Sequence, residues 1–300
     1  MNTLLSQVKT GKIKKPELIL LYGPDKMGKS TFGSQAPKPI FIGTEDGTAN
    51  LDVPRIPSPK KIEDVFQAIQ ELTEAQHDYQ TLIIDSLDWM EPLVHEKVCR
   101  DGSKERIEDF GYGIGYKNAL VEWRKLIRAL EALQVKRRIN VVLVAHSEIK
   151  TFNDPQTNSA YDRYQLKLYD RASALFREFV DVILFANQET HTTKEKGDQK
   201  WKAFSEGKSK AYTERRPAFD AGNRYGLPFE LELSWKAYQD ARDSLVGETI
   251  EELKKSVVGL LENVKDSDLL AKAKASIEKA GSNTDQLRNI KRRLMELTAA

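Results

Sequence analysis

Short, largely apolar segments alternate with stretches of helical periodicity over most of the chain. The strand-sized segments lie at 18–22, 39–43, 81–85, 140–145 and 180–186. Between them, apolar residues recur every three or four positions, at Ile62, Val65, Phe66, Ile69 and Leu72, and again at Leu120, Trp123, Ile127, Leu130 and Leu133. Strands that are apolar throughout are buried on both faces. The pattern therefore predicts a parallel sheet with helices on both faces.

The pattern changes in the last third of the chain. Residues 190–193 and 201–204 alternate around Lys196-Gly197-Asp198-Gln199, which is typical of a β-hairpin, and 229–233 alternates again. From about Ser244 onward the pattern is helical, with Gly281-Ser282-Asn283 between two amphipathic stretches. We expect an α/β fold with a mostly parallel sheet, an antiparallel hairpin extension and a small C-terminal helical region.

Three domains follow from these boundaries. Residues 1–16 form a lead-in, in which Leu4, Leu5 and Val8 could make a docking strip. Residues 17–240 form the α/β core. Residues 245–300 form a helical hairpin or bundle.

Two segments of the core have loop-like sequences. In 110–116, glycine alternates with aromatic or apolar residues, which disfavours a helix and gives a mobile segment with stackable rings. Residues 150–166 are polar and include Pro155, and we expect a long loop there. Long loops inside compact domains are usually functional or disordered.

Composition and charge narrow the class of protein. Hydrophobic content of 40% and charged content of 31% describe a soluble globular chain without a membrane span, and 1–10 lacks the apolar core of a signal peptide. The single Cys99 permits no internal disulfide, which suits a reducing compartment, so we expect a cytoplasmic protein, or one of the host cytoplasm if it is viral. Because the net charge is only +2, any DNA binding must be local.

The most specific motif follows the first apolar segment. Gly23-Pro24-Asp25-Lys26-Met27-Gly28-Lys29-Ser30-Thr31 fits the phosphate-binding loop pattern G-x-x-x-x-G-K-[ST]. The glycines let backbone N–H groups turn toward an anion. Lys29 would reach the β- and γ-phosphates and Ser30 would ligate Mg²⁺. ATP is a better candidate than GTP, because no N-K-x-D-like motif is found in the chain.

Three further residues end strands at the edge of the sheet where ligands bind. Asp85 follows the apolar run 81–84, as in a Walker B motif, and would be the second Mg²⁺ residue; alternatively it caps the next helix. Glu45 is the candidate for orienting the attacking water, or else a surface loop residue. His146 would contact the γ-phosphate, or else is a structural residue at a strand end.

Together these motifs resemble the RecA-type recombinase core. The phosphate loop, Phe41-Ile42-Gly43-Thr44-Glu45, Leu82-Ile83-Ile84-Asp85-Ser86 and Val142-Leu143-Val144-Ala145-His146 occur in the order of that core, over roughly 18–233. The chain is most similar to phage-encoded, RecA-like nucleotide-binding proteins of the single-strand annealing group. Residues 110–116 and Asn223-Arg224-Tyr225-Gly226-Leu227-Pro228 are similar to that group.

The resemblance has functional implications. It implies that Glu45 is the catalytic glutamate, and that 102–115 and 150–166 are two DNA-binding loops. It also implies that Arg215, Arg216 or Arg224 completes the site of a neighbouring subunit in a homo-oligomer, a ring or a filament.

The residues of the two loops are themselves suited to single-stranded DNA, because aromatic side chains stack on bases and cations bind phosphates. The candidates are Tyr112, Tyr116, Lys150, Phe152, Tyr161, Arg163 and Tyr164. The alternative is that the aromatic rings are buried under the loops.

The leading hypothesis is a Mg²⁺-dependent ATPase that assembles on single-stranded DNA for recombination or annealing. A RecA-like motor or helicase accessory is a second hypothesis. The third is a nucleotide-regulated binding module with little hydrolysis, whose helical tail recruits a partner such as a single-strand binding protein.

Overall fold

The computed structural model describes residues 15–45, 50–193, 202–246, 250–261, 267–281 and 283–298. Its strands are β1 Leu18–Gly23, β2 Pro39–Gly43, β3 Arg55–Ile56, β4 Thr81–Asp85, β5 Asn140–Phe152, β6 Tyr161–Leu166, β7 Val182–Thr193, β8 Lys202–Tyr212, β9 Gly222–Asn223 and β10 Glu230–Glu232. Its α-helices are α1 Lys29–Ser34, α2 Ile62–Glu74, α3 Leu87–Asp101, α4 Ile114–Arg137, α5 Asp170–Phe179, α6 Trp235–Val246, α7 Ile250–Leu261, α8 Ser267–Ala280 and α9 Thr284–Thr298. A short 3-10 helix, η3, covers Ile107–Phe110. None of the helices in the described part of the chain has the length and apolar character needed to cross a membrane.

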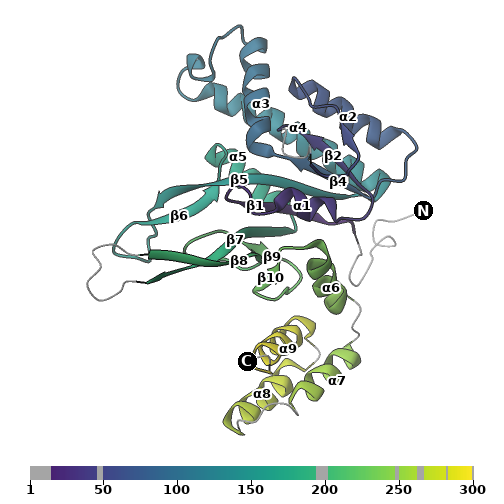
Figure 1. The fold of residues 1–300 in the computed structure, drawn as a ribbon, viewed down its shortest axis with the longest axis vertical. Helices are drawn as coiled ribbons and strands as arrows, with labels where there is room; N and C mark the ends of the chain where they lie inside the picture. The colour runs from purple at the N-terminus through teal and green to yellow at the C-terminus, as the bar shows by residue number, and fades with distance from the viewer. Residues whose placement is uncertain are drawn as a thin grey trace, which may run out of the picture.

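One mixed sheet forms the centre of the molecule (Figure 1). Its strand order is β10-β8-β7-β1-β5-β4-β2-β3, with β6 paired to β5 and β9 to β7. Strands β3, β2, β4, β5, β1 and β7 are parallel to one another, whereas β8, β10, β6 and β9 pair in antiparallel fashion. Since β1, β2, β4 and β5 run parallel, the segments that follow β1, β2 and β4 meet at one edge of the sheet.

Each face of the sheet carries its own hydrophobic core. In β1, Leu18, Leu20 and Tyr22 face one core, which α2, α3, α4 and α5 complete. Ile19 and Leu21 face the other core, to which Phe32 of α1 and Trp235 and Tyr238 of α6 belong. Because successive side chains of a strand point to opposite faces, both sets must be apolar. This explains why the central segments are apolar without alternation.

The expected fold class is confirmed: an α/β fold with a mostly parallel sheet, an antiparallel extension formed by β7, β8 and β10, and helices at the C-terminal end. The turn expected at 196–199 and the strip at Leu4, Leu5 and Val8 lie outside the described residues. Helices α7, α8 and α9 pack on one another through Leu253, Ala280 and Leu287, and lie beyond α6 in Figure 1.

The prediction of a long loop at 150–166 is wrong. Strand β5 continues past His146 as far as Phe152 and pairs with β6 in an antiparallel arm, from Ser147 opposite Leu166 to Phe152 opposite Tyr161. Figure 1 shows this arm extending from the sheet. Polar side chains such as Thr151 and Asp162 line it because it is solvated, and their hydrogen bond links the two strands. The polar side chains of the arm therefore reflect its exposure to solvent and not a lack of secondary structure.

The close approach of β1 and β7 gives a test of the fold. An added Cβ on Gly23 would lie 2.0 Å from the carbonyl oxygen of Ala186, and this backbone atom cannot move without disturbing β7. We expect Gly23→Ala to lower the free energy of unfolding by about 1–3 kcal/mol or more. Urea denaturation measures this difference.

Gly222→Ala is the matched control. The Cβ of that variant would have no described atom within 4 Å, so a change within about 0.5 kcal/mol is expected. Equal unfolding free energies for the two variants would contradict the packing of β1 against β7.

Candidate functional site

The phosphate-binding loop connects β1 to α1. Gly28 has a φ of +93°, in the left-handed region that glycine adopts without steric cost. Lys29, the first residue of α1, is only 5% exposed, and its ammonium group donates hydrogen bonds to the carbonyl oxygens of Gly23, at 3.1 Å, and Pro24, at 2.7 Å. Burial lowers the pKa of Lys29, while the charge of Asp85 raises it. The lysine is thus folded back onto its own loop.

Ser30 and Asp85 contact each other across the two motifs. The Ser30 hydroxyl donates to Oδ2 of Asp85 at 2.5 Å. Asp85 is 1% exposed, and its Oδ1 has no hydrogen-bond partner in the described part of the chain. Burial raises the pKa of Asp85, against the hydrogen bond from Ser30. A buried carboxylate oxygen without a partner, beside a hydroxyl, fits a hard cation such as Mg²⁺.

Glu45 is held at the same edge by the end of β2. The backbone N–H of Thr44 donates to the Asp85 carbonyl at 2.8 Å, and the Thr44 hydroxyl donates to the Ser86 carbonyl at 2.8 Å. The Ser86 N–H in turn donates to the Thr44 hydroxyl at 2.8 Å. These hydrogen bonds fix the backbone of Thr44, the residue directly before Glu45. Burial and the charge of Asp85 raise the pKa of Glu45.

His146 lies directly opposite Gly23 in the β1–β5 register. Its Nδ1 is 2.9 Å from Oδ2 of Asp88, and its backbone N–H donates to Asp88 Oδ1 at 2.9 Å. Its Nε2 is 3.5 Å from an Asp25 oxygen. The hydrogen bond with Asp88 raises the pKa of His146. Because Asp88 holds Nδ1, the other ring nitrogen, Nε2, points toward the phosphate loop.

These residues surround one cavity of about 560 Å³. Of the predicted residues, Asp25, Lys26, Met27, Gly28, Lys29, Ser30, Thr31, Glu45, Asp85 and His146 line it. The structure adds Asn50, Leu51, Trp89 and Lys167. Asp88 was also missed from the sequence. Its position three residues after Asp85, on the first turn of α3, was the available signal.

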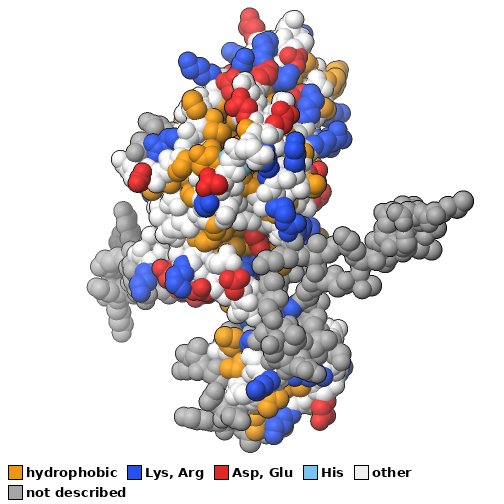
Figure 2. Space-filling model, turned by 90° about the vertical axis from the view of Figure 1, so that its right-hand side faces the viewer, with side chains coloured by type: hydrophobic (Ala, Val, Ile, Leu, Met, Phe, Trp, Pro, Cys, Tyr) orange, Lys and Arg blue, Asp and Glu red, His pale blue; other side chains and the backbone are white. Residues whose placement is uncertain are grey.

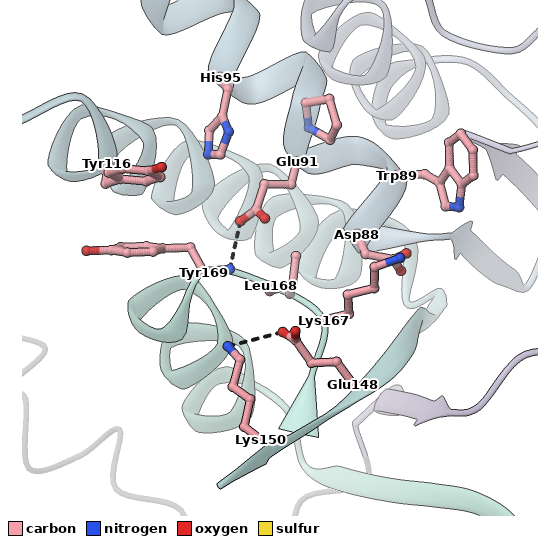
Figure 3. Close-up of a pocket in the computed structure, with 11 residues that line it drawn as sticks. Asp88, Trp89, Glu91, His95, Tyr116, Glu148, Lys150, Lys167, Leu168 and Tyr169 are labelled. Carbon is pink, nitrogen blue, oxygen red and sulfur yellow. Dashed lines mark hydrogen bonds and ion pairs between the residues drawn. The ribbon is translucent and has the colours of Figure 1, made fainter. Parts of the chain in front are cut away.

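A second cavity, of about 450 Å³, is shown in Figure 3. Trp89 and Lys167 line both cavities. Its aromatic wall includes Tyr116, whose ring stacks on Tyr169 with centroids 4.6 Å apart. His95 packs edge-on against Tyr116, with centroids 5.5 Å apart. The wall of this cavity therefore combines aromatic rings with charged side chains such as Glu91, Glu148 and Lys150.

The predicted DNA-binding residues occupy different environments. Tyr112 is fully exposed at 100%, between Gly111 and Gly113. Phe152 and Tyr161 pack edge-on at the end of the arm, with centroids 5.7 Å apart. Tyr164 packs on Phe185, with centroids 5.2 Å apart. Lys150 pairs with Glu148 and Asp170.

Arg163 is buried, at 3% exposure, and pairs with Asp220. Asp220 also accepts a hydrogen bond from Arg177, and its backbone N–H and carbonyl both bond to the Tyr22 hydroxyl. The expectation that Arg163 is available to DNA phosphates is therefore wrong for this conformation, because its guanidinium group neutralises an internal carboxylate.

The three arginines predicted to act on a neighbouring subunit lie on the segment between β8 and α6. Arg215 is 3.5 Å from Asp220 and largely exposed. The guanidinium of Arg216 lies 4.0 Å from the centroid of the Phe229 ring. Arg224 is 3.2 Å from Asp181 and largely exposed. None of these three residues lines the phosphate-loop cavity.

A parallel sheet with a phosphate-binding loop after its central strand and an acidic residue ending β4 defines a P-loop protein. The chain belongs to the AAA domain family, whose model matches residues 15–225. The search of curated proteins gave no match. Among solved structures, the one described as "Crystal structure of the RadB recombinase" is similar with a TM-score of 0.38 and 16% identity, over 69% of this chain and 85% of that chain.

The Asp88–His146 pair predicts a pH-dependent stability. The pKa of His146 is raised in the folded protein. The pair therefore contributes its full stabilisation to the folded protein below the ordinary histidine pKa of about 6.5, and this contribution is lost as the pH rises through the raised pKa of His146. We expect Asp88→Asn to cost about 1.5–3 kcal/mol at pH 6 and clearly less at pH 9. Urea unfolding at both pH values measures the difference.

The control is Asp78→Asn, which removes an exposed pair with Lys38 and should cost about 0–1 kcal/mol at either pH. If Asp88→Asn costs the same free energy at pH 6 and pH 9, the charged pair does not form.

Proposed function

We propose that this chain is a Mg²⁺-dependent ATPase of the RecA type that binds single-stranded DNA in recombination or strand annealing. The observation that carries the proposal is the convergence of Lys29, Ser30, Asp85, Glu45 and His146 on one cavity. Phosphoryl transfer to water needs phosphate positioning, charge neutralisation and an oriented nucleophile. This cavity offers side chains suited to each of these tasks.

The geometry supports the following roles. Lys29 exchanges its two loop carbonyls, which hold it in place, for β- and γ-phosphate oxygens. Ser30 and Asp85 would hold Mg²⁺, which would neutralise phosphate charge. Glu45, with its raised pKa, orients the attacking water and accepts its proton. His146, held by Asp88, directs Nε2 at the terminal phosphate.

Single-strand binding rests on aromatic side chains, of which Tyr112 is fully exposed and Phe152 and Tyr161 are half-buried. Tyr112 on the segment before α4, and Phe152 and Tyr161 on the arm, are available for base stacking, which is worth about 1–3 kcal/mol per base. On the face in Figure 2, acidic and basic side chains are interspersed, so stacking rather than a broad positive field would supply the specificity for single strands. Lys150 lies on the arm, two residues before Phe152, and could bind a phosphate of the strand.

The assembly and the tail extend the proposal. We propose a homo-oligomer, a ring or a filament, in which Arg215, Arg216 or Arg224 reaches a neighbour's nucleotide. All three are exposed. Residues 17–240 would form the ATPase core and 245–300 a helical unit that contacts a partner such as a single-strand binding protein. Membership of the phage-type annealing group and a cytoplasmic location remain predictions from the sequence.

The main alternative is a nucleotide-regulated binding module with little hydrolysis. The folded-back Lys29 favours it, because the lysine must leave two carbonyl partners before it can bind phosphate. A RecA-like motor accessory would instead couple turnover to movement along the strand.

ATP turnover with Mg²⁺, with and without single-stranded DNA, tests the proposal. Glu45→Gln should lower kcat by about 10²–10⁴-fold while ATP still binds, because only the oriented water is lost. Lys29→Ala should weaken ATP binding itself. Glu131→Gln, an exposed change on α4, is the control and should leave turnover unchanged.

DNA-stimulated turnover that disappears in Glu45→Gln would support the ATPase. ATP binding without turnover under any condition would favour the binding module, and Glu45 would lose its assigned role.

Tyr112 tests the strand contact separately. Because it is fully exposed and has no structural neighbour to lose, Tyr112→Ala should weaken binding of a labelled single strand by about 1–3 kcal/mol without changing stability. Fluorescence anisotropy gives the affinity. Val135→Ala removes another exposed apolar side chain, 84% exposed on α4, and serves as control. Equal affinities for both variants would remove Tyr112 from the strand contact.

A further inference from the structure

The backbone of Lys167 is fixed at the base of the arm by the residues around it. It follows the last residue of β6, and its neighbours Leu166 and Leu168 are each 3% exposed. Its backbone N–H donates to the carbonyl oxygen of His146 at 2.9 Å. The two buried leucines and this hydrogen bond anchor the backbone of Lys167 directly beside His146. The side chain itself is exposed.

The side chain of Lys167 lies where the two cavities meet. It lines the phosphate-loop cavity together with Lys29, Glu45 and Asp85, and it also lines the neighbouring aromatic cavity. Figure 3 shows it directed from the ribbon toward the position of Asp88. A long, flexible ammonium group anchored at this place can reach into the phosphate cavity without any movement of the backbone.

The charges around Lys167 indicate what it would bind. Lys29 donates to Gly23 and Pro24, and Lys150 pairs with Glu148 and Asp170. By contrast, the Lys167 ammonium group has no hydrogen bond or ion pair to any described residue. It is a cation that lines a phosphate-binding cavity and is not committed to a protein carboxylate, which suits an anionic group of the ligand.

We propose that Lys167 contacts the γ-phosphate of a nucleoside triphosphate bound in its own subunit. The inference rests on the proposed nucleotide site and adds to it one further side chain that contacts phosphate. The loop lysine, Lys29, reaches the β- and γ-phosphates from the loop, whereas Lys167 approaches the γ-phosphate from the His146 side of the cavity. A diphosphate lacks the group that Lys167 contacts, so the lysine discriminates between the two nucleotides.

The position of Lys167 also connects nucleotide state to the arm. His146 precedes the antiparallel part of β5 and Lys167 follows β6, so the two residues lie together at the base of the arm, where Ser147 is opposite Leu166. Both contact the same phosphate in this proposal. A γ-phosphate would therefore bridge the side chains of the two residues at the base of the arm, and its loss would remove that bridge.

Equilibrium binding of two nucleotides to the full chain tests the inference. A non-hydrolysable ATP analogue and ADP, each with Mg²⁺, are titrated into wild type, Lys167→Ala and Lys167→Gln by calorimetry. Both variants should lose about tenfold in affinity for the analogue, the size of one charge-assisted hydrogen bond, and less than twofold for ADP. Lys167→Arg should restore most of the affinity, since it keeps the charge.

Lys136→Ala is the control, because Lys136 is an exposed cation near the end of α4. It should leave both affinities unchanged. Thermal unfolding of each variant identifies any that fails to fold, and the glutamine variant keeps the length of the side chain in case alanine disturbs the arm.

The outcomes separate this inference from the proposed function. If wild type binds both nucleotides and neither Lys167→Ala nor Lys167→Gln lowers the ratio of analogue affinity to ADP affinity, the lysine does not contact the γ-phosphate, and the nucleotide site stands without it. An equal loss for both nucleotides in folded variants also overturns the inference. If wild type binds neither nucleotide, the proposed function fails and this inference fails with it.

Discussion

The burial of one carboxylate, that of Asp85, is the constraint on which the site depends. Asp85 ends β4 at 1% exposure with one oxygen bonded to Ser30 and the other without a partner among the described residues. An ionised carboxylate in such a position is costly unless a positive charge compensates it. Nearby, Lys29 supplies part of that charge. The site is therefore electrostatically incomplete by itself, which is the property expected of a centre that binds a cation with its nucleotide.

The main features of this centre were predictable from the sequence because they depend on short-range patterns. Apolar runs such as 18–22 predict buried strands, and the spacing of Gly23, Gly28 and Lys29 predicts the loop that follows. The placement of Glu45, Asp85 and His146 at one edge then follows from the parallel order of strands. Their catalytic roles stay predictions, since a geometry shows proximity and not turnover.

Other features depend on tertiary contacts that no local pattern contains. The arm formed by β5 and β6 has polar side chains on a solvated strand pair, and these resemble loop residues in sequence. Arg163 looks like a surface cation until Asp220, 57 residues further along the chain, is placed beside it. Asp88 gains its role from His146, 58 residues away, and Lys167 from its hydrogen bond to the same histidine. In each case the partner residue decides the function of the side chain.

The contacts of Asp220 have a consequence for how the chain can evolve. This one carboxylate receives Arg163 from β6 and Arg177 from α5, while its backbone bonds to Tyr22 of β1. Replacement by a neutral residue would leave the buried charge of Arg163 without a counter-ion, and loss of a buried partner is far more costly than loss of a surface pair. A change there would have to be accompanied by a change at Arg163. We therefore expect relatives of this chain to vary at the two positions together or at neither.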